Sequence, residues 1–356
     1  MESIATDKDL IIAERGGVIE NRHKVHAAIV DARGKLLFAV GDPSRLTLIR
    51  SAAKPAQALA VLETGGFHQF GFDDADLALM CASHSSEPRH LSRARCMLQK
   101  AQAEEKDLRC GGHPSLSPSI NDAWIKNSYQ PTAICNNCSG KHTGMIAGTK
   151  SLGAGVATYH HQEHPIQQRV KRVTEELAGL DTQEVLWSID GCNLPAPALP
   201  LRSLATMYAR FADSADQCKE SPSVSTRTQA MSRIFHAMAQ HPELVAGDDR
   251  FCTVLMQAFQ GCLIGKVGAD GCYGVGIQES AQTVRLGAEG AVGISVKIED
   301  GNLAILYCAV AEILEQLELG TSVIRKSLES FQHPVISNTA GVVTGHVVPA
   351  FQLSAV

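Results

Sequence analysis

Arg50-Ser51-Ala52-Ala53-Lys54, followed directly by Pro55, is the stretch around which the rest of this chain can be interpreted. It contains the only Ser-x-x-Lys of the sequence. Residues three apart on a helix lie on one face, so the serine and lysine side chains can meet. Serine becomes a strong nucleophile when a base takes its proton, and a neutral lysine amine is such a base. The stretch therefore indicates either a nucleophilic serine or an ordinary helix start with a surface lysine.

The residues on both sides of this stretch predict that Ser51 lies at the beginning of a helix. Residues 46–49 are expected to be extended, and residues 56–64 to form a helix that ends at Gly65. Pro55 fits the first helical turn because the N–H groups there have no partner within the helix. At such a position the helix dipole stabilises negative charge that develops on a nearby atom.

Composition and charge exclude several classes of protein. The chain has 356 residues, of which 44% are hydrophobic and 19% charged, as in ordinary globular proteins. A net charge of −5 without a basic block argues against a nucleic-acid partner. We expect no signal peptide and no membrane-spanning segment. Eleven cysteines, several within apolar runs, favour reduced thiols and a cytoplasmic location over a disulfide framework.

The order of the expected elements predicts one α+β domain over residues 1–356. Residues 18–40 alternate in polarity around a glycine-containing turn, which is typical of a β-hairpin. Three further β-rich runs are separated by glycine turns, at residues 271–277, 292–298 and 303–310. We therefore expect an antiparallel sheet from about 18–50 and 271–310, with a helical subdomain over about 51–260. Residues 110–140 are rich in Gly, Pro, Ser and Asn, and are expected to form long loops.

Two short motifs lie downstream of the Ser-x-x-Lys stretch, namely Ser83-x-Ser85 and Lys266-x-Gly268. In chain order, the three elements resemble those of penicillin-binding proteins and serine β-lactamases, which are Ser-x-x-Lys, Ser-x-Asn and Lys-Thr-Gly. The sheet layout inferred above is similar to the layout of those enzymes. The order of the motifs therefore favours a serine β-lactamase-like fold.

A second cluster of reactive side chains surrounds Cys135-x-x-Cys138. This spacing is typical of a structural zinc site or of a thioredoxin-like redox pair. A redox pair needs a βαβ context that we do not expect here, and a four-cysteine zinc site needs a second Cys-x-x-Cys, which the sequence lacks. Two alternatives remain open from the residues alone. One is an open metal site with two thiolates and one nitrogen ligand, and the other is a pair of loop thiols without a special role.

Four segments of the chain form a distinctive set. They are the stretch Arg50-Ser51-x-x-Lys54, residues 137–145 (Asn-Cys-Ser-Gly-Lys-His-Thr-Gly-Met), residues 188–192 (Ser-Ile-Asp-Gly-Cys) and residues 265–271 (Gly-Lys-Val-Gly-Ala-Asp-Gly). Together they resemble the L-asparaginase II family of rhizobial-type, class 3 asparaginases. The resemblance extends over nearly the whole chain. The Asn-Cys-Ser-Gly-Lys-His motif is long enough to be specific. Cys135 is an additional thiol that the resemblance does not require.

The resemblance implies a serine β-lactamase-like fold, a homodimer, and hydrolysis of L-asparagine to L-aspartate and ammonia. It also implies two serine–lysine pairs, Ser51 with Lys54 and Ser83 with Lys266. A zinc ion would be bound by Cys138, Lys141 and Cys192. Because Ser51 supplies the nucleophile, we expect the zinc to support substrate binding rather than to activate water.

An amino-acid substrate presents an α-carboxylate and an α-ammonium, so its pocket needs one fixed charge of each sign. Arg50, next to Ser51, is the candidate for the carboxylate because its guanidinium can form two parallel hydrogen bonds. Asp190 and His142 are the candidates for the amino end.

Two other functions remain compatible with the sequence. The first is an amidase, an esterase or an acyl-transferring tailoring enzyme that uses the same scaffold on another substrate. The second is a zinc- or redox-dependent binding protein centred on Cys135 and Cys138. The sequence does not determine the preference between asparagine and glutamine, nor the physiological role.

Overall fold

The computed structural model describes residues 8–221 and 223–356. The chain divides into two compact units, each built from separate stretches of sequence. Unit 1 contains the residues up to Ala52, together with Leu199–Asp213 and Gly265–Val356. Unit 2 contains Ala53–Ala198 and Ser214–Ile264.

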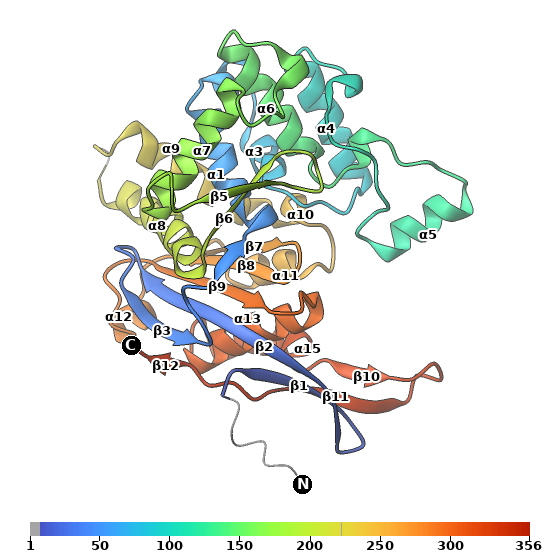
Figure 1. Ribbon diagram of the computed structural model, residues 1–356, viewed down its shortest axis with the longest axis vertical. Coiled ribbons are helices and arrows are strands. Elements are labelled where there is room, and N and C mark those ends of the chain that lie inside the picture. Colours follow the sequence, from blue (N-terminus) through green and yellow to red (C-terminus); the bar gives the residue numbers. More distant parts are fainter. Residues whose placement is uncertain (1–7, 222) are drawn as a thin grey trace. The chain divides into compact units, whose positions relative to one another are not determined.

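Unit 1 is built on one sheet, which has nine strands in the described part of the chain. Seven strands follow the order β10-β11-β1-β2-β9-β8-β7, while β3 pairs with β2 and β12 pairs with β3. N-terminal strands, blue in Figure 1, therefore lie beside C-terminal strands, orange to red. Their bounds are β1 (Leu10–Arg15), β2 (Val18–Asp31), β3 (Leu36–Val40), β7 (Leu263–Gly268), β8 (Cys272–Ile277), β9 (Val292–Ile298), β10 (Val335–Ser337), β11 (Val343–Pro349) and β12 (Ser354–Ala355).

Helices cover both faces of the central strands of this sheet. Strand β9 is buried along its whole length, and α13 (Leu303–Gln316) packs against β8, β9 and β11. The first part of α8 (Leu201–Glu220) lies against the same strands. A Cβ atom added at Gly293 would lie only 1.9 Å from the carbonyl oxygen of Ala205, so glycine lets the helix backbone touch the sheet. The remaining helices of unit 1 are α12 (Ala281–Arg285), α14 (Ser322–Lys326) and α15 (Glu329–Gln332).

Unit 2 is mainly helical, and its helix α1 (Lys54–Leu62) packs against α6, α7 and α9. Eight of the nine residues of α1 are buried, including Lys54. Strands β5 (Leu186–Ile189) and β6 (Pro195–Pro200) form an antiparallel pair. The other helices are α2 (Gly66–Gln69), α3 (Asp74–Met80), α4 (Pro88–Lys100), α5 (Pro118–Lys126), α6 (Ser139–Ser151), α7 (Pro165–Ala178), α9 (Thr226–Gln240), α10 (Pro242–Val245) and α11 (Phe251–Ala258). Short 3-10 turns occur at η3 (Glu105–Asp107), η4 (Ala133–Cys135) and η5 (Val156–Thr158).

The predicted α+β class and the antiparallel sheet from both ends of the chain are confirmed. The hairpin within residues 18–40 is also confirmed, as β2 paired with β3. The serine β-lactamase-like fold and the single domain stay predictions. Among the described residues, no helix combines the length and apolar character that crossing a membrane requires.

Three local predictions are wrong. Residues 303–310 form the beginning of helix α13 and not a strand. A continuous apolar run fits a buried helix as well as a buried strand, and the Asn302 side chain caps this helix by accepting the N–H of Ile305 at 3.2 Å. The expected loop 110–140 contains the exposed helix α5. The sheet also extends beyond its predicted limits, because β1 begins at Leu10, β7 precedes residue 271, and β10, β11 and β12 follow residue 310.

Candidate active site

Ser51 lies in the 3-10 turn η2 (Arg50–Ala53), which follows the short strand β4 (Leu46–Leu48) and leads into α1. The predicted position of Ser51 at the start of a helical segment is therefore confirmed. Arg50 has a left-handed backbone with φ of 49°, which is strained for a residue with a side chain. The Tyr208 hydroxyl donates a hydrogen bond of 2.9 Å to the carbonyl of Ala52 and helps to hold the turn. Strain of this kind, held by surrounding contacts, is typical of functional positions.

Lys266 lies on strand β7 of unit 1 and is fully buried. Its Nζ donates to the carbonyl oxygen of Val267 at 2.9 Å. Gly268 approaches the chain just before Ser51, because a Cβ added there would lie 2.4 Å from the Ile49 carbonyl oxygen. Residues two apart on a strand point to the same face. Lys266 therefore points to the face of β7 that the Ile49 carbonyl approaches.

The guanidinium of Arg50 already has a carboxylate partner within unit 1. Its Nη1 donates to Oδ2 of Asp270 at 2.6 Å. Asp270 lies between β7 and β8, and its side chain is 77% exposed. An ion pair with so exposed a partner contributes little stability and can be exchanged for another carboxylate. Arg50 thus stays compatible with binding of a substrate carboxylate.

Lys54 and Ser83 are in direct contact in unit 2. The Lys54 Nζ donates to Ser83 Oγ at 3.0 Å and also to the carbonyl of Ala82. Lys54 is fully buried, and Ser83 is 4% exposed. This contact joins one member of each serine–lysine pair implied by the family resemblance. The sequence did not predict it.

Cys138, Lys141 and Cys192 also converge in unit 2. Cys138 caps the N-terminus of α6, Lys141 lies in its first turn, and Cys192 comes from the turn between β5 and β6. The Lys141 Nζ donates to Cys192 Sγ at 2.9 Å, and both side chains are at least 95% buried. Helical spacing explains why Cys138 and Lys141 meet, whereas Cys192 is brought in by the β5–β6 pair.

The charges of this cluster are strongly coupled. The hydrogen bond from Cys138, followed by the charge of Lys141, holds the pKa of the Cys192 thiol well below its ordinary value of 9.0. The hydrogen bond with Cys192, followed by burial, raises the pKa of Cys138 to about 12. Burial alone would lower the pKa of Lys141, but the charges of Cys138 and Cys192 raise it above 10.5. These shifts favour negative charge on Cys192 and positive charge on Lys141.

His142 is a neutral, buried donor beside this cluster. Burial, followed by the charge of Lys141, lowers the pKa of His142 to about 3. The Tyr159 hydroxyl lies 2.6 Å from His142 Nδ1 and accepts the N–H of Arg109 at 2.9 Å. A Tyr159 hydroxyl proton donated to Nδ1 would place the ring proton on Nε2. Among the described residues, no group has hydrogen-bonding geometry to this buried Nε2, although the carbonyl of Cys192 influences the pKa of the ring.

Electrostatic contacts link the remaining candidates of unit 2 to the same place. The charge of Lys54 lowers the pKa values of both Cys138 and His142, and the carboxylate of Asp190 raises that of Lys141. The unit 2 candidates are Lys54, Ser83, Cys138, Lys141, His142, Asp190 and Cys192, all of which are buried except the half-buried Asp190. The unit 1 candidates are Arg50, Ser51 and Lys266.

The donor set of Cys138, Lys141 and Cys192 fits a zinc ion. A lysine binds a metal only as a neutral amine, so zinc would have to displace the proton of Lys141. Two sulfur atoms and one such nitrogen are ligands that zinc prefers, and a fourth position would be open to a small molecule. Within residues 8–221 and 223–356, no group of three or more His, Cys, Asp or Glu side chains is arranged to hold a metal. The fit therefore depends on the lysine as the third ligand.

Two further cysteines clarify what the sequence left open. Cys135 contacts the Tyr129 hydroxyl, at 3.2 Å from its Sγ. All eleven cysteines are free thiols, so Cys135 and Cys138 do not form a disulfide. Cys110 lies close enough to the cluster for the charges of Cys138 and Cys192 to raise its pKa, after burial as the main cause. Sequence reasoning missed Cys110, and its glycine-rich surroundings were the only signal of a functional loop.

His90, near the Ser83 segment, gives unit 2 a specific sensitivity to acid. It is fully buried, its Nδ1 accepts the N–H of Glu87 at 3.1 Å, and its Nε2 lies 2.8 Å from the Glu243 carbonyl. Burial is the largest cause that lowers its pKa from 6.5 to about 4. Between pH 6.5 and about 4, His90 therefore binds a proton in the unfolded chain but not in the folded chain. Stability is fully present above pH 6.5 and decreases as the pH falls towards 4.

We expect this one histidine to cost about 1.4 kcal/mol of unfolding free energy per pH unit within that window. His90→Gln keeps a donor for the Glu243 carbonyl but cannot titrate. Thermal or denaturant unfolding from pH 7 to 4.5 should show a shallower loss of stability in this variant than in the wild type. Equal pH dependence of the two proteins would contradict the assignment.

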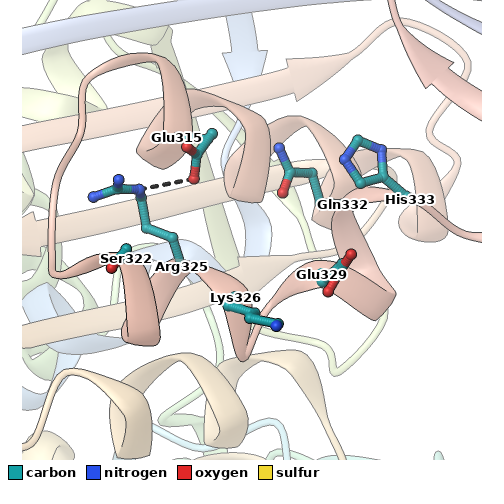
Figure 2. Close-up of a pocket in the computed structure, with 7 residues that line it drawn as sticks. All are labelled: Glu315, Ser322, Arg325, Lys326, Glu329, Gln332 and His333. Atoms are coloured by element: carbon teal, nitrogen blue, oxygen red, sulfur yellow. Dashed lines mark hydrogen bonds and ion pairs between the residues drawn. The ribbon is translucent and has the colours of Figure 1, made fainter.

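A surface pocket of about 260 Å³ lies at α14 and α15 in unit 1 (Figure 2). Its side chains carry both charge signs, and Arg325 Nε pairs with Glu315 Oε2 at 2.7 Å. The lining residues are Glu315, Ser322, Arg325, Lys326, Glu329, Gln332 and His333. None of them is a candidate site residue, so this pocket has no part in the chemistry described here.

Comparison with known proteins identifies one family. A family model described as L-asparaginase II matches residues 11–349. The search of curated proteins returned no match. The matched range includes every candidate site residue of both units.

Proposed function

The chain belongs to the L-asparaginase II family, and from this premise we propose that it hydrolyses L-asparagine to L-aspartate and ammonia. Family membership supports an asparaginase-type amidohydrolase. The observation that carries the proposed mechanism is the buried hydrogen bond between Lys54 and Ser83. Lys54 lies three residues after Ser51 in the sequence. A buried lysine within hydrogen-bonding distance of a serine is arranged for proton transfer.

In the proposed first step, Ser51 Oγ attacks the side-chain amide carbon of asparagine. Lys54, acting as a neutral amine, takes the hydroxyl proton. The tetrahedral intermediate collapses to an acyl-enzyme on Ser51, and the amide nitrogen leaves as ammonia after it gains a proton. Water then attacks the ester, the bond to Ser51 Oγ breaks, and aspartate is released with the serine reprotonated.

The second pair, Ser83 with Lys266, is proposed to deliver the proton to the departing nitrogen. Ser83 Oγ is already hydrogen-bonded to the Lys54 Nζ, so a proton taken by Lys54 can pass to Ser83 in one step. Lys266, on strand β7, is proposed to keep Ser83 in the protonation state that this proton relay requires. A single proton thus leaves Ser51 and reaches the leaving group without entering bulk water.

Fixed charges of both signs are proposed to bind the amino-acid substrate. We propose that Arg50 binds the α-carboxylate and that Asp190 binds the α-ammonium. His142 has its ring proton on Nε2, so it suits an oxygen atom of the substrate better than the ammonium that the sequence suggested. Two opposite fixed charges and one neutral donor would distinguish a free amino acid from a simple amide.

Zinc is proposed as a resident ion held by Cys138, Lys141 and Cys192. When bound, it would supply positive charge and fix the positions of α6 and the β5–β6 turn. These elements carry His142 and Asp190, so the proposed role is support of substrate binding. Since Ser51 is the proposed nucleophile, no step of the reaction passes through the metal.

Metal content tests this site directly. Protein purified without chelator is expected to contain about one zinc per chain, and Cys192→Ala to lose it, because the variant removes one of three ligands. Cys96→Ala is a matched control, since Cys96 is an exposed cysteine outside the cluster. Zinc retained at the wild-type level in Cys192→Ala would remove this site from the account.

The experiment that tests the proposed function is an ammonia-release assay with a panel of amides. L-asparagine should be hydrolysed fastest. Succinamate, which lacks the α-ammonium, and β-alanine amide, which lacks the α-carboxylate, should each show a much higher KM. Preferential turnover of simple amides or esters would instead support an amidase or esterase on this scaffold. The same panel settles the preference between asparagine and glutamine.

Two properties of the whole molecule are proposed, the first from the family resemblance and the second from the cysteine content of the sequence. We propose a homodimer, which sedimentation of the purified protein tests, and a cytoplasmic location, which cell fractionation tests. Free thiols at all eleven cysteines are compatible with a reducing compartment.

A further inference from the structure

The segment that follows α3 links two loops of unit 2 through its backbone and side chains. On one side, the Ser83 N–H donates to the Val245 carbonyl at 2.9 Å, and the Ser85 N–H donates to the Ala246 carbonyl at 2.9 Å. Ser83 and Ser85 are two residues apart, and successive residues of an extended chain face opposite ways. Both bonds are therefore made on the same side of the segment. The last residue of α10 and the residue that follows it therefore fix Ser83 and Ser85.

His84 and Ser86, which face the opposite way, are hydrogen-bonded to the loop before α6, which contains Cys135. The His84 N–H donates to the carbonyl of Asn137 at 3.2 Å, and the Ser86 hydroxyl donates to the carbonyl of Cys135 at 2.7 Å. The segment 83–86 thus connects the loop before α6 with the end of α10. Ser83 lies between these attachments, directly beside His84.

The tautomer of His84 follows from its neighbours. The Ser86 N–H donates to Nδ1 at 3.1 Å, so Nδ1 carries a lone pair and the ring proton lies on Nε2. This Nε2–H donates to Ser139 Oγ at 2.9 Å. The ring is fully buried and stacks on His90, with centroids 5.1 Å apart and planes 13° apart. Its orientation is therefore fixed from three directions.

The partner of His84 belongs to the metal motif. Ser139 begins α6 and directly follows Cys138, while Ser83 directly precedes His84 and lies 3.0 Å from the Lys54 Nζ. We propose that His84 is a positioning residue that holds Ser83 at its distance from Lys54 by anchoring the segment to Ser139. The catalytic meaning of this geometry rests on the proposed function, but the geometry itself does not.

A buried histidine can also be an ordinary structural residue, and two variants separate these roles. The side-chain amide of asparagine reaches the place of Nδ1, and that of glutamine reaches the place of Nε2. His84→Gln therefore keeps the bond to Ser139 and loses the bond from Ser86. His84→Asn does the reverse. Each variant removes one buried hydrogen bond, so a purely structural role predicts similar losses of stability and of activity in both.

We expect the two variants to differ in kcat and to share a nearly unchanged KM. His84→Asn should lose about 10- to 100-fold in kcat, because small misplacements of reacting groups have effects of this size. His84→Gln should retain most of the wild-type kcat. Ser139→Ala should resemble His84→Asn, and combining the two should add little, since both remove the same contact. Equal losses of kcat in His84→Gln and His84→Asn would overturn the proposal.

A structural readout keeps this test independent of the proposed substrate. Crystal structures of both variants and of Ser139→Ala give the separation of Lys54 Nζ and Ser83 Oγ. It should stay close to 3.0 Å in His84→Gln and lengthen in His84→Asn and in Ser139→Ala. If the wild type releases no ammonia from asparagine, the proposed function fails, and these distances alone then decide whether His84 positions Ser83. An unchanged separation in His84→Asn and Ser139→Ala would overturn the positioning role.

Discussion

Replacing Ser51 by alanine is expected to lower kcat for asparagine by about 10³-fold or more, because the variant has no atom that can form the acyl-enzyme. KM should change little, since Arg50 and Asp190 are still present to bind the substrate. The strained turn at Arg50 and the hydrogen bond from Tyr208 to Ala52 use backbone and side-chain atoms that the substitution leaves in place. The fold should therefore be retained, as thermal unfolding can verify.

The matched control is Ser44→Ala, an exposed serine of the same unit, which should behave as the wild type. Turnover in Ser51→Ala within a few-fold of the wild-type rate would exclude Ser51 as the nucleophile. It would favour a protein whose chemistry is centred on the cysteine cluster.

Lys54→Met is expected to lower kcat by about 10²- to 10⁴-fold, because the variant removes the group proposed to take the serine proton. Methionine has nearly the length of lysine and no charge, so it can fill the buried space that Lys54 occupies. Ser83 loses its hydrogen-bond partner at 3.0 Å in the same substitution. The defect should therefore lie in kcat much more than in KM.

Lys126→Met on the exposed helix α5 is the matched control for the loss of a lysine. Because Lys54 also influences the pKa of His142, the variant should be assayed over a range of pH. A Lys54→Met enzyme with the wild-type kcat at every pH would rule out the lysine as the base.

The sequence was sufficient to predict the elements with strong local signals. The turn and helix around Ser51 follow from Pro55 and from the apolar residues after it, and the β2–β3 hairpin follows from alternation around a glycine turn. Residues 303–310 were predicted as a strand because a run that is apolar on every side has no period to distinguish a buried strand from a buried helix. At that position Asn302, which caps helix α13, was the residue that indicated a helix.

Local motifs indicated which residues are candidates for the site, but they did not predict which of these residues are in contact. The spacing of Cys138 and Lys141 predicts that their side chains can meet, but the contact of Lys54 with Ser83 depends on how the segment after α3 is held by two stretches distant in sequence. Those stretches contain Val245 and Asn137, and only the tertiary structure brings them together. The tautomers of His84 and His142 are likewise set by neighbours, such as Tyr159, that no motif includes.

The most direct test of the central claim is detection of the acyl-enzyme on Ser51. The protein is mixed with L-asparagine, quenched in acid within the first turnover, digested, and analysed by mass spectrometry. The account predicts that the peptide containing Ser51 gains the mass of one aspartyl group, and that Ser51→Ala shows no such gain at any peptide. An aspartyl group on another residue, or ammonia release without any acylated peptide, would contradict it.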